Sequence, residues 1–429
     1  MKTELANGAA EMLRLKQQYL VPCVYHFYRE PPVLCGGDDA YVFDTQGRRY
    51  LDCFTGVTVT SAGHCNPEII EPAIEQIRRL GHTTSIYLTE PVLRLAEALA
   101  EIAPGDLKRS FFTASGTEAV EGALLTAALH TKRRRVLAFD NGLHGRTRWA
   151  MNVTGAPMWR TDPFPQDDIV HVPFGDADAV EAALAGGSFA AVIGEPIQGN
   201  GGVNVPPRHF WPRVRDACNR TGTLLVLDEI QTGLGRTGRP WACEHWDVAP
   251  DVLCTSKALG NGFPIAAFIT TDAIADSYTR PGASTYGGNP VSATAALATL
   301  RYHADHDLAN AASSTGRALR ESLAKLTGAI LDEPRGLGLM IGCPVASTEL
   351  CDELLERLKT HGVLAGKTGP GRDVLTLLPP LTFTPEQCDE LLEALQVSLD
   401  EVEAFCLTRV ADDGDGQRLR DERADGGAA

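Results

Sequence analysis

Short, unbroken hydrophobic runs recur along the middle of the chain, and each is followed by a polar or glycine-containing turn and then by a segment with helical periodicity. Runs of this length without polar alternation are typical of strands buried on both faces, which occur in mainly parallel sheets covered by helices. The pattern therefore predicts an α/β domain. The runs lie at residues 110–114, 135–139, 189–194, 223–228, 251–256 and 265–270.

The two ends of the chain have a different pattern. Residues 40–52 predict a β-hairpin around Thr45-Gln46-Gly47, and residues 349–362 and 385–406 carry leucines at helical spacing. We expect the two ends to form jointly a smaller domain against the large one. The expected parts are residues 1–60 and 306–407 for the small domain, 61–305 for the large domain, and 408–429 for a flexible tail with few apolar residues.

Composition and charge narrow the class of partner. The chain has 429 residues, of which 44% are hydrophobic and 22% charged, as in folded, water-soluble proteins. Lys and Arg number 39 against 55 Asp and Glu, which gives a net charge of −16. Such a field repels polyphosphate backbones and anionic lipid surfaces, so we expect neither nucleic acid nor a membrane as a partner.

The cysteines indicate a redox compartment. There are eleven, an odd number, scattered along the chain without a Cys-x-x-Cys pair. This argues against a disulfide framework and against a metal site, and it favours a reducing cytoplasm. The first residues lack the long apolar segment of a signal peptide, and no run is long enough to span a bilayer. We therefore expect a cytoplasmic protein.

A carboxylate and a lysine follow two of the hydrophobic runs. Asp228 ends the run 223–228, and Lys257 follows the run 251–256. Ligands of open α/β sheets bind beyond the carboxyl ends of the strands. Either residue alone is more often a charged cap on a buried strand. Together they are what pyridoxal phosphate requires, namely a lysine that bonds the aldehyde and a carboxylate that keeps the pyridine nitrogen protonated.

A possible phosphate cradle precedes them. The run 110–114 leads into Ser115-Gly116-Thr117 and then into a helical segment. First-turn N–H groups and the helix dipole favour a bound anion there. The competing interpretation is a capping box between Ser115 and Glu118, and this segment alone does not decide between the two.

Seven blocks of the sequence, in order, resemble the class III aminotransferases, which are pyridoxal-phosphate enzymes of fold type I. The resemblance covers about residues 25–400, and the opening part is closest to the subgroup of alanine–glyoxylate aminotransferase and the amino-alcohol phosphate phospho-lyases. It implies a large domain with a mainly parallel sheet and a smaller α+β domain. The blocks are SGTEAVEGAL, LHGRT, EPIQGNGG, LLVLDEIQTGLGRTG, PDVLCTSKALGNGFPIAA, STYGGNP and RGLGLMIG.

The resemblance also implies roles for single residues. Lys257 would bond the cofactor aldehyde and carry the proton between the substrate and the cofactor, and Asp228 would hold the pyridine nitrogen. Thr285 would reach the cofactor phosphate from the other subunit of a homodimer. The remaining implied cofactor-binding residues are Ser115, Gly116 and Thr117 near the phosphate, Leu143 and Ile230 on the ring faces, His144, Gln231 near the phenolic oxygen, and Glu195 on the substrate side.

Three positions depart from the family pattern. Leu143 stands where the family commonly has an aromatic residue stacked on the cofactor ring. Thr376 stands where the family has the arginine that pairs with the substrate α-carboxylate, and Asn200 replaces a glutamate that neutralises this arginine in some members. Arg146, by contrast, matches the arginine that holds the far carboxylate of ω-amino-acid donors. The N-terminal segment with Tyr25 would help to wall the substrate pocket.

These features predict an aminotransferase that moves an amino group from an amine or ω-amino acid to a 2-oxo acid or aldehyde by a ping-pong mechanism. A lyase or decarboxylase with the same cofactor is the alternative, because the pocket decides which substrate bond aligns with the cofactor ring. A non-catalytic scaffold would not need Lys257 and Asp228. A nicotinamide-dependent dehydrogenase would need a glycine fingerprint that the sequence lacks.

Overall fold

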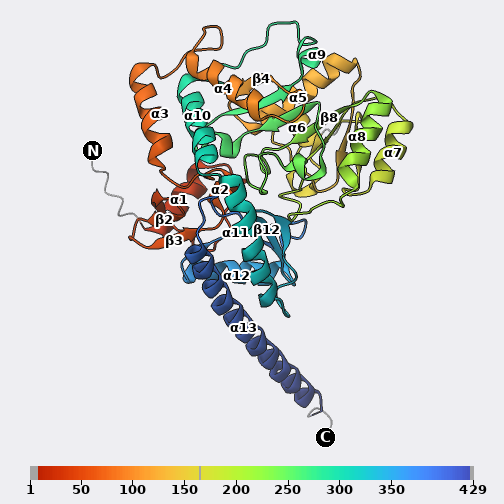
Figure 1. Cartoon of the computed structure of the whole chain (residues 1–429). Coiled ribbons are helices and arrows are strands. Elements are labelled where there is room, and N and C mark those ends of the chain that lie inside the picture. The colour runs from red at the N-terminus through yellow and green to blue at the C-terminus, as the bar shows by residue number, and fades with distance from the viewer. Residues whose placement is uncertain (1–7, 164–165, 426–429) are drawn as a thin grey trace.

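A seven-stranded sheet forms the centre of the molecule. The computed structural model describes residues 8–163 and 166–425, with side chains as far as Leu407 (Figure 1). From one edge to the other the strands are β4 (Arg109–Thr113), β10 (Ala266–Thr270), β9 (Val252–Thr255), β8 (Leu224–Asp228), β7 (Phe189–Gly194), β5 (Arg135–Phe139) and β6 (Ile169–Val172). Neighbours from β9 to β6 are parallel, and β10 runs antiparallel to both of its neighbours. The predicted α/β class with a mainly parallel sheet is confirmed.

All six predicted runs are strands of this sheet. The pattern did not predict β6, a short edge strand whose His171 interrupts the hydrophobic run. Nor did it predict the reversed direction of β10, because hydrophobic burial on both faces is the same in either direction.

Both faces of the sheet are covered by helices, and alternate side chains of a strand enter different cores. In β8, Leu225 and Leu227 pack into one core and Val226 into the other. This is the period of two that a strand imposes. The first core includes α4 (Glu90–Ile102), α7 (Ala177–Ala185), α8 (Phe210–Thr221) and α10 (Pro290–Asp305), and the second includes α5 (Gly116–Thr131), α6 (Arg148–Val153) and α9 (Asp272–Ala275).

A separate core, away from the seven-stranded sheet, joins residues from both ends of the chain, including Tyr28 to Cys53 and Leu308 to Val402. Strand β13 (Val363–Leu364) pairs in parallel with β3 (Arg49–Asp52), which ties the two ends together. The domain limits drawn from the sequence remain a prediction. The other elements here are β1 (Leu34–Asp38), β2 (Tyr41–Asp44), β11 (Arg335–Leu337), β12 (Met340–Pro344), β14 (Gly366–Thr368), β15 (Val374–Leu377), α11 (Leu308–Leu323) and α12 (Thr348–Thr360).

The hairpin expected at residues 40–52 is formed by β2 and β3, and Gly47 has the left-handed φ of +82° that such a turn favours. Two short connections, α2 (Thr55–Thr58) and α3 (Pro67–Arg79), link this hairpin to the large sheet, and α3 packs on α10 through Ile69 and Ala73.

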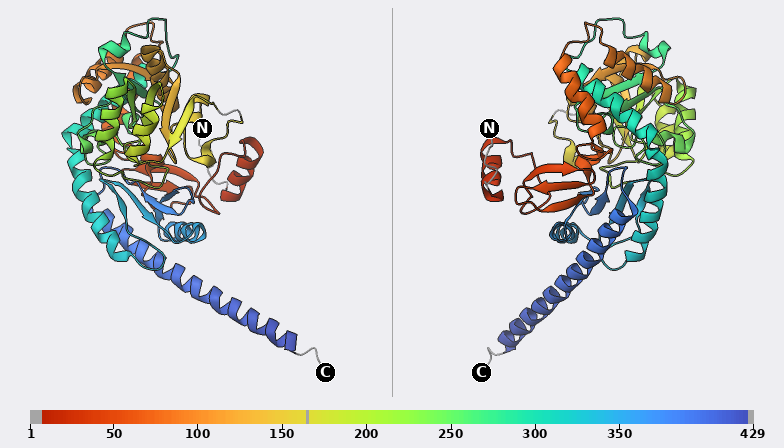
Figure 2. Two further views of the ribbon diagram at one scale, coloured as in Figure 1. Left: turned by 90° about the vertical axis from the view of Figure 1, so that its right-hand side faces the viewer. Right: turned by 60° about the vertical axis from the view of Figure 1, so that its left-hand side comes forward.

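The helices nearest the two chain ends stand away from the body (Figure 2). Helix α1 (Ala9–Tyr19) has no buried residue, and α13 (Pro385–Asp425) extends well beyond the small domain. The segment expected as a flexible tail is thus helical as far as Asp425, and residues 426–429 lie outside the described part. The tail's flexibility remains a prediction. Within the described ranges, no helix is both long and apolar enough to cross a membrane.

Candidate active site

A cavity of about 390 Å³ lies beyond the carboxyl ends of β7, β8 and β9. This is the edge at which open α/β sheets bind ligands. Ten of the residues singled out from the sequence as site residues line it, together with Asn200. The ten are Gly116, Thr117, Leu143, His144, Arg146, Glu195, Asp228, Ile230, Gln231 and Lys257.

Lys257 begins a short 3₁₀ turn directly after β9 and reaches the cavity from the strand end. Its φ of +44° is left-handed, a conformation that is uncommon for a residue other than glycine and is often found at functional sites. Burial lowers the pKa of Lys257 because it disfavours the ammonium form, while the charges of Asp228 and Glu195 oppose this shift. A lowered pKa leaves more of the amine neutral and nucleophilic.

Asp228 ends β8 and is buried with only 3% of its surface exposed. His144 donates from Nδ1 to Oδ2 of Asp228 at 2.8 Å, and the amide of Ile230 donates to Oδ1 at 3.1 Å. Burial disfavours the imidazolium, but the hydrogen bond and the negative charge of Asp228 outweigh it, so the pKa of His144 is raised. His144 thus gives the buried carboxyl group of Asp228 a hydrogen-bond partner, which a buried polar group needs.

Glu195 follows β7 and is 4% exposed. Its Oε1 accepts from the amide of Leu143 at 3.0 Å, and its Oε2 accepts from the amide of Gly199 at 2.9 Å. Burial raises the pKa of Glu195. Glu195 is therefore not a solvated acid at a strand end, because the loops that carry Leu143 and Gly199 enclose it.

The first turn of α5 faces the cavity with Gly116 and Thr117. Ser115 donates to Glu118 at 3.0 Å and does not cap the helix amides, although the carboxylate of Glu118 also accepts from the amide of Ala114 at 2.9 Å. A capping contact therefore exists, but it leaves the first-turn amides of α5 to another acceptor. An anion at this helix N-terminus would supply one.

The loop that follows β5 is fixed to the same helix end. The hydroxyl of Thr117 accepts from the amide of Arg146 at 3.0 Å and from the amide of Thr147 at 3.1 Å. A Cβ on Gly116 would lie 2.8 Å from Cδ1 of Ile230, so a larger residue at position 116 would require the end of that side chain to shift.

The residues present fit pyridoxal phosphate. In the part of the chain described, Oε1 of Gln231 and Nε2 of His144 are buried side-chain atoms without a hydrogen-bond partner, and such atoms are rare unless a ligand or water completes them. Both residues line the cavity that also holds the amine of Lys257 and the carboxylate of Asp228. A Cβ on Gly199 would meet Oε1 of Gln231 at 1.3 Å, so the backbone closes tightly behind that amide.

Four expected residues lie outside the cavity lining. Ser115 precedes the helix, and Thr285 is exposed on the loop between α9 and α10. Thr376 is buried in β15, where its hydroxyl shares a 2.7 Å hydrogen bond with the hydroxyl of Thr368 and donates to the carbonyl of Val374 at 3.0 Å. Tyr25 is 47% exposed and packs against Trp159, with ring centroids 5.9 Å apart.

The sequence analysis missed Gly145, Trp159 and Ser256 as site residues, and they also line the cavity. Ser256 could have been found from its place before Lys257. Trp159 lies in a 3₁₀ turn, Pro157–Trp159, and no periodic pattern there indicates a site.

Glu229 lies behind Asp228 and faces away from the cavity lining. Its Oε1 accepts from the amide of Cys243 at 2.8 Å, and its Oε2 accepts from the hydroxyl of Thr232. Burial raises the pKa of Glu229 to about 7. The strand end therefore carries two adjacent acids with different surroundings.

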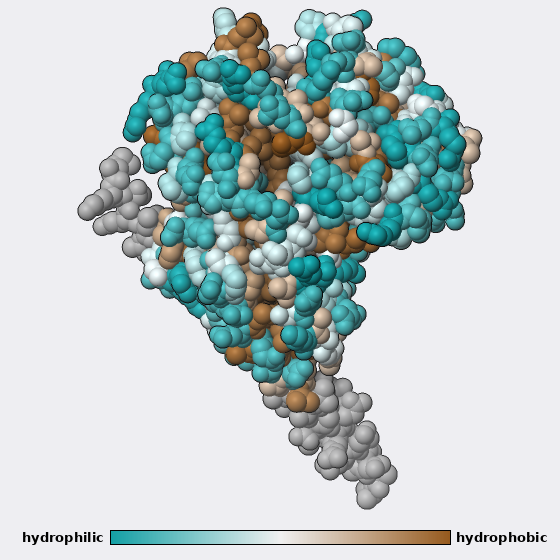
Figure 3. Space-filling view, in the orientation of Figure 1, coloured by the Kyte–Doolittle hydropathy of each residue, from teal (hydrophilic) through white to brown (hydrophobic). Residues whose placement is uncertain are grey.

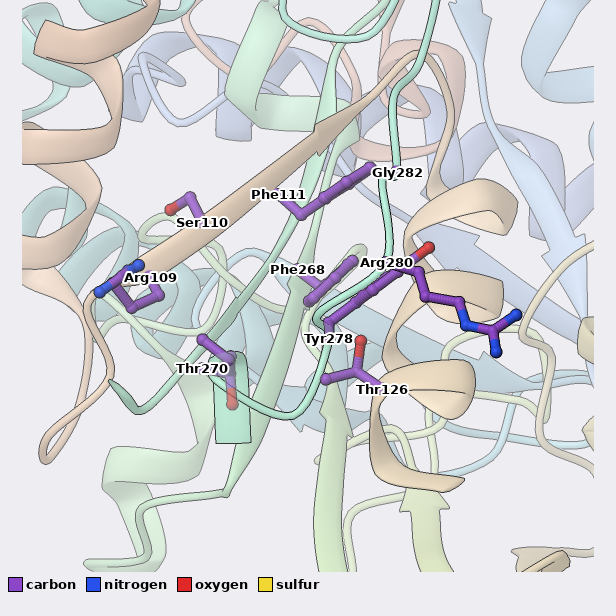
Figure 4. A pocket seen from close by; sticks show the side chains of 10 residues that line it. Arg109, Ser110, Phe111, Thr126, Phe268, Thr270, Tyr278, Arg280 and Gly282 are labelled. Carbon is purple, nitrogen blue, oxygen red and sulfur yellow. The ribbon is translucent and has the colours of Figure 1, made fainter. Parts of the chain in front are cut away.

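A second cavity, of about 230 Å³, lies between β4, β10 and α5 (Figure 4). The rings of Phe111 and Phe268 stack there at 5.3 Å, and Arg109 and Arg280 contribute the charged side chains. Its lining contains neither a lysine nor a carboxylate. Within the described ranges, no cluster of three or more His, Cys, Asp and Glu side chains could hold a metal ion. The first cavity is thus the candidate active site.

The fold and the site together define a pyridoxal-phosphate-dependent transferase of fold type I. The family model Aminotransferase class-III matches residues 31–399, and the chain belongs to this family. It is 37% identical over 423 residues to alanine–glyoxylate aminotransferase 2 homolog 2 of Arabidopsis thaliana, covering 92% of this chain and 88% of that one. It is 38% identical over 385 residues to acetylornithine aminotransferase of Methanopyrus kandleri, covering 87% and 97%.

Solved structures show the same likeness. The ornithine aminotransferase of Toxoplasma gondii superposes with a TM-score of 0.88 at 30% identity, covering 94% of this chain and all of that one. A phospholyase from Arthrobacter in complex with phosphoethanolamine superposes with a TM-score of 0.86 at 30% identity, covering 91% and 99%. The protein is a class III aminotransferase, and pyridoxal phosphate is its cofactor.

Proposed function

We propose that the protein transfers an amino group from a primary amine or ω-amino acid to a 2-oxo acid or aldehyde by a ping-pong mechanism. The observation that carries this substrate class is Thr376, whose hydroxyl is fully engaged by Thr368 and Val374. An α-carboxylate needs a bidentate cation for strong binding, and a buried threonine cannot supply one.

The residues that would act on the cofactor suit the transfer of an amino group. Bound pyridoxal phosphate supplies an electron sink next to the reacting carbon. We assign Lys257 as the nucleophile that holds the cofactor and as the base that moves the substrate proton, consistent with its lowered pKa. Asp228, supported by His144, holds a proton on the pyridine nitrogen.

The remaining contacts hold and orient the ring. Leu143 and Ile230 would pack on its two faces, and Gln231 would use its free amide beside the phenolic oxygen. Gly116 and Thr117 would bind the phosphate at the start of α5. Glu195 would border the substrate side.

On the substrate side we assign Arg146 as a carboxylate-binding residue. It lines the cavity, and its backbone is held by the hydroxyl of Thr117. A donor with its amine on a primary carbon and its carboxylate further along the chain would fit this arrangement, because it needs no cation at position 376.

A lyase that eliminates phosphate from an amino-alcohol phosphate is the second candidate. The similar phospholyase from Arthrobacter was solved with phosphoethanolamine, and a cation at Arg146 would suit a phosphate group as well as a carboxylate. The two functions differ in their products, since a lyase releases inorganic phosphate and a transferase leaves an aminated cofactor.

We propose a homodimer in which Thr285 contributes to the partner's cofactor site. The loop with Thr285 carries Tyr286, which is 67% exposed, and it adjoins exposed Ile86, Tyr87 and Leu88 near a cavity lined by both segments. Figure 3 shows apolar, brown areas around the upper hollow of the face in view. Such an exposed apolar surface is typical of a protein interface.

A cytoplasmic location also remains a proposal. All eleven cysteines are free thiols in the structure, which is the state that a reducing compartment maintains.

A half-reaction screen tests the proposed function. The holoenzyme is mixed with primary amines, ω-amino acids, α-amino acids and phosphoethanolamine, and both the loss of the cofactor's yellow band and the release of phosphate are recorded. We expect faster conversion by amines or ω-amino acids than by α-amino acids. Release of phosphate without lasting bleaching would support the lyase, and preferred conversion of α-amino acids would contradict the proposal.

A further inference from the structure

The lysine turn, residues 257–261, begins and ends with a left-handed backbone, since Lys257 has a φ of +44° and Asn261 a φ of +43°. The amide of Asn261 donates to the carbonyl of Ala258 at 3.3 Å and closes the turn. At its start, the hydroxyl of Ser256 donates to the carbonyl of Ile265 at 3.0 Å. A left-handed backbone costs free energy in residues other than glycine, so surrounding contacts must hold this shape.

The side chain of Asn261 supplies such contacts at the end of the turn. Its Oδ1 accepts from the amide of Ala62 at 2.9 Å, and its Nδ2 donates to the carbonyl of Gly63 at 3.0 Å. Both groups of the side-chain amide therefore bond the backbone of one loop, residues 61–64. Ala62 and Gly63 are buried, so these hydrogen bonds are shielded from competing water.

The loop 61–64 is itself tied to the small domain. His64 exchanges two backbone hydrogen bonds with Asp39, at 2.7 and 3.0 Å. The carbonyl of Ser61 accepts from the amide of Leu381 at 2.7 Å. Because Asp39 and Leu381 come from opposite ends of the chain, the loop is held by both parts of the small domain. Asn261 is thus a link between that domain and the lysine turn.

The segment before this loop has an unusual backbone. Thr55, Val57 and Thr58 have φ values from +49° to +66°, although all three are β-branched. The amide of Thr55 donates to Oδ1 of Asp52 at 2.8 Å, and its hydroxyl donates to the carbonyl of Leu378 at 2.8 Å. This segment also packs on the lysine turn. Such outliers persist where many contacts fix them, and they cluster at functional sites.

We propose that Asn261 is a positioning residue that sets the direction of the Lys257 side chain and couples it to the small domain. Without its two side-chain hydrogen bonds, the lysine turn would keep its own backbone bonds but would be free to shift relative to the loop 61–64. The amine of Lys257 would then lie out of place in the cavity. The inference rests on the proposed role of Lys257 as nucleophile and base.

The test uses Asn261→Gly, because glycine adopts a φ of +43° without strain and the variant removes only the side-chain hydrogen bonds. The readout is the ratio of circular dichroism to absorbance in the yellow band of the holoenzyme, which depends on how the protein orients the chromophore. We expect this ratio to fall by about half, since a reacting group must be held within about 0.5 Å. The half-reaction rate at saturating donor should fall about tenfold, with little change in KM.

Asn66→Ala is the matched control. Asn66 donates from Nδ2 to the carbonyl of Ala62 at 2.8 Å, and its Oδ1 accepts from the amide of Glu68 at 3.0 Å. Its loss therefore removes two hydrogen bonds beside the same loop without touching the lysine turn. Both variants should lower the melting temperature, but only Asn261→Gly should change the dichroism ratio. Equal ratios for Asn261→Gly and the wild type, or equal changes in the two variants, would overturn the positioning role.

The same measurement separates this inference from the proposed function. The dichroism ratio needs no donor, so it still reports on Asn261 if the proposed donor class is wrong. A borohydride-reducible chromophore in Lys257→Ala would instead contradict the assignment of Lys257, and the inference about Asn261 would fall with it.

Discussion

The two walls of the cavity are built differently. On the cofactor side, Asp228, Glu195 and His144 are at most 4% exposed, and each has a protein partner at 2.8–3.1 Å. On the substrate side, Arg146 and Asn200 line the cavity from loops of the large domain, and Tyr25, which is 47% exposed, packs on the cavity-lining residue Trp159. The cofactor wall thus comes from ends of strands in one sheet, whereas the substrate side combines loops of that domain with a segment near the start of the chain.

The difference reflects what each wall must do. Charges that act on the cofactor need a dry, fixed environment, where hydrogen bonds keep their protonation states and positions. A substrate has to enter and leave, so the substrate side needs hydrogen-bond donors that only a bound substrate satisfies. The positions that match the family lie mostly on the first wall. Of the departures, Asn200 and Leu143 line the cavity, whereas Thr376 is buried in β15 outside its lining.

Loss of Lys257 should have the largest effect. In Lys257→Ala the nucleophile and the base disappear together, so we expect the transamination rate to fall by about 10⁴-fold or more. The purified variant should also lack the yellow, borohydride-reducible chromophore of the wild type. Lys325→Ala, an exposed lysine, is the control. A variant that retains the reducible chromophore would rule out Lys257 as the cofactor's attachment point.

The buried region behind the cofactor wall, where Glu229 follows Asp228, should also make the stability of the fold depend on pH. Burial raises the pKa of Glu229 from 4.5 to about 7, so between these values the folded state binds more protons than the unfolded state, and stability falls as the pH rises. The shift of 7 − 4.5 = 2.5 pH units corresponds to about 3 kcal/mol.

Glu229→Gln cannot ionise, so its free energy of unfolding should fall by about 3 kcal/mol less than that of the wild type between pH 4 and pH 8. Urea denaturation at a series of pH values measures this difference. Glu97→Gln, an exposed acid on α4, should follow the wild type. Parallel curves for Glu229→Gln and the wild type would show that Glu229 ionises normally.

Restoring the missing cation would change the substrate wall. Thr376→Arg should raise kcat/KM for glutamate by about tenfold, because a guanidinium can pair with the α-carboxylate. Thr376→Val removes the hydroxyl at nearly the same volume and should give no such gain. A folded Thr376→Arg enzyme that uses glutamate no better would contradict the alignment of Thr376 with the family arginine.

The smallest expected effect is on cofactor binding and concerns Leu143, which would pack on one face of the cofactor ring. An aromatic side chain at position 143 would stack on the cofactor ring, and such pairs contribute about 0.5–1.5 kcal/mol. Leu143→Phe should therefore lower the dissociation constant of pyridoxal phosphate by about two- to tenfold, as measured by equilibrium dialysis. Leu143→Ile, which stays aliphatic, should leave it unchanged. The same constant for Leu143→Phe and wild type would show that this position adds little to binding.

Much of the fold followed from local patterns. Buried strands must be apolar throughout, so the five inner strands were visible in the sequence. The edge strand β4 also carries a hydrophobic run, whereas His171 interrupts the run of β6 at the other edge. The cofactor wall was accessible for a related reason, because parallel strands end at one edge and bring Asp228 and Lys257 together.

The sequence by itself determined the sheet, the family and the group of residues at the strand ends, because these depend on composition over a few neighbouring positions. Only the tertiary structure decided that Thr376 is enclosed by Thr368, and that the ring of Tyr25 and the cation of Arg372 meet 347 positions apart along the chain (372 − 25). The contact between Tyr25 and Arg372 arises where the two ends of the chain pack against each other, and the contact between Thr368 and Thr376 arises from the pairing of β14 with β15. No local periodicity records either.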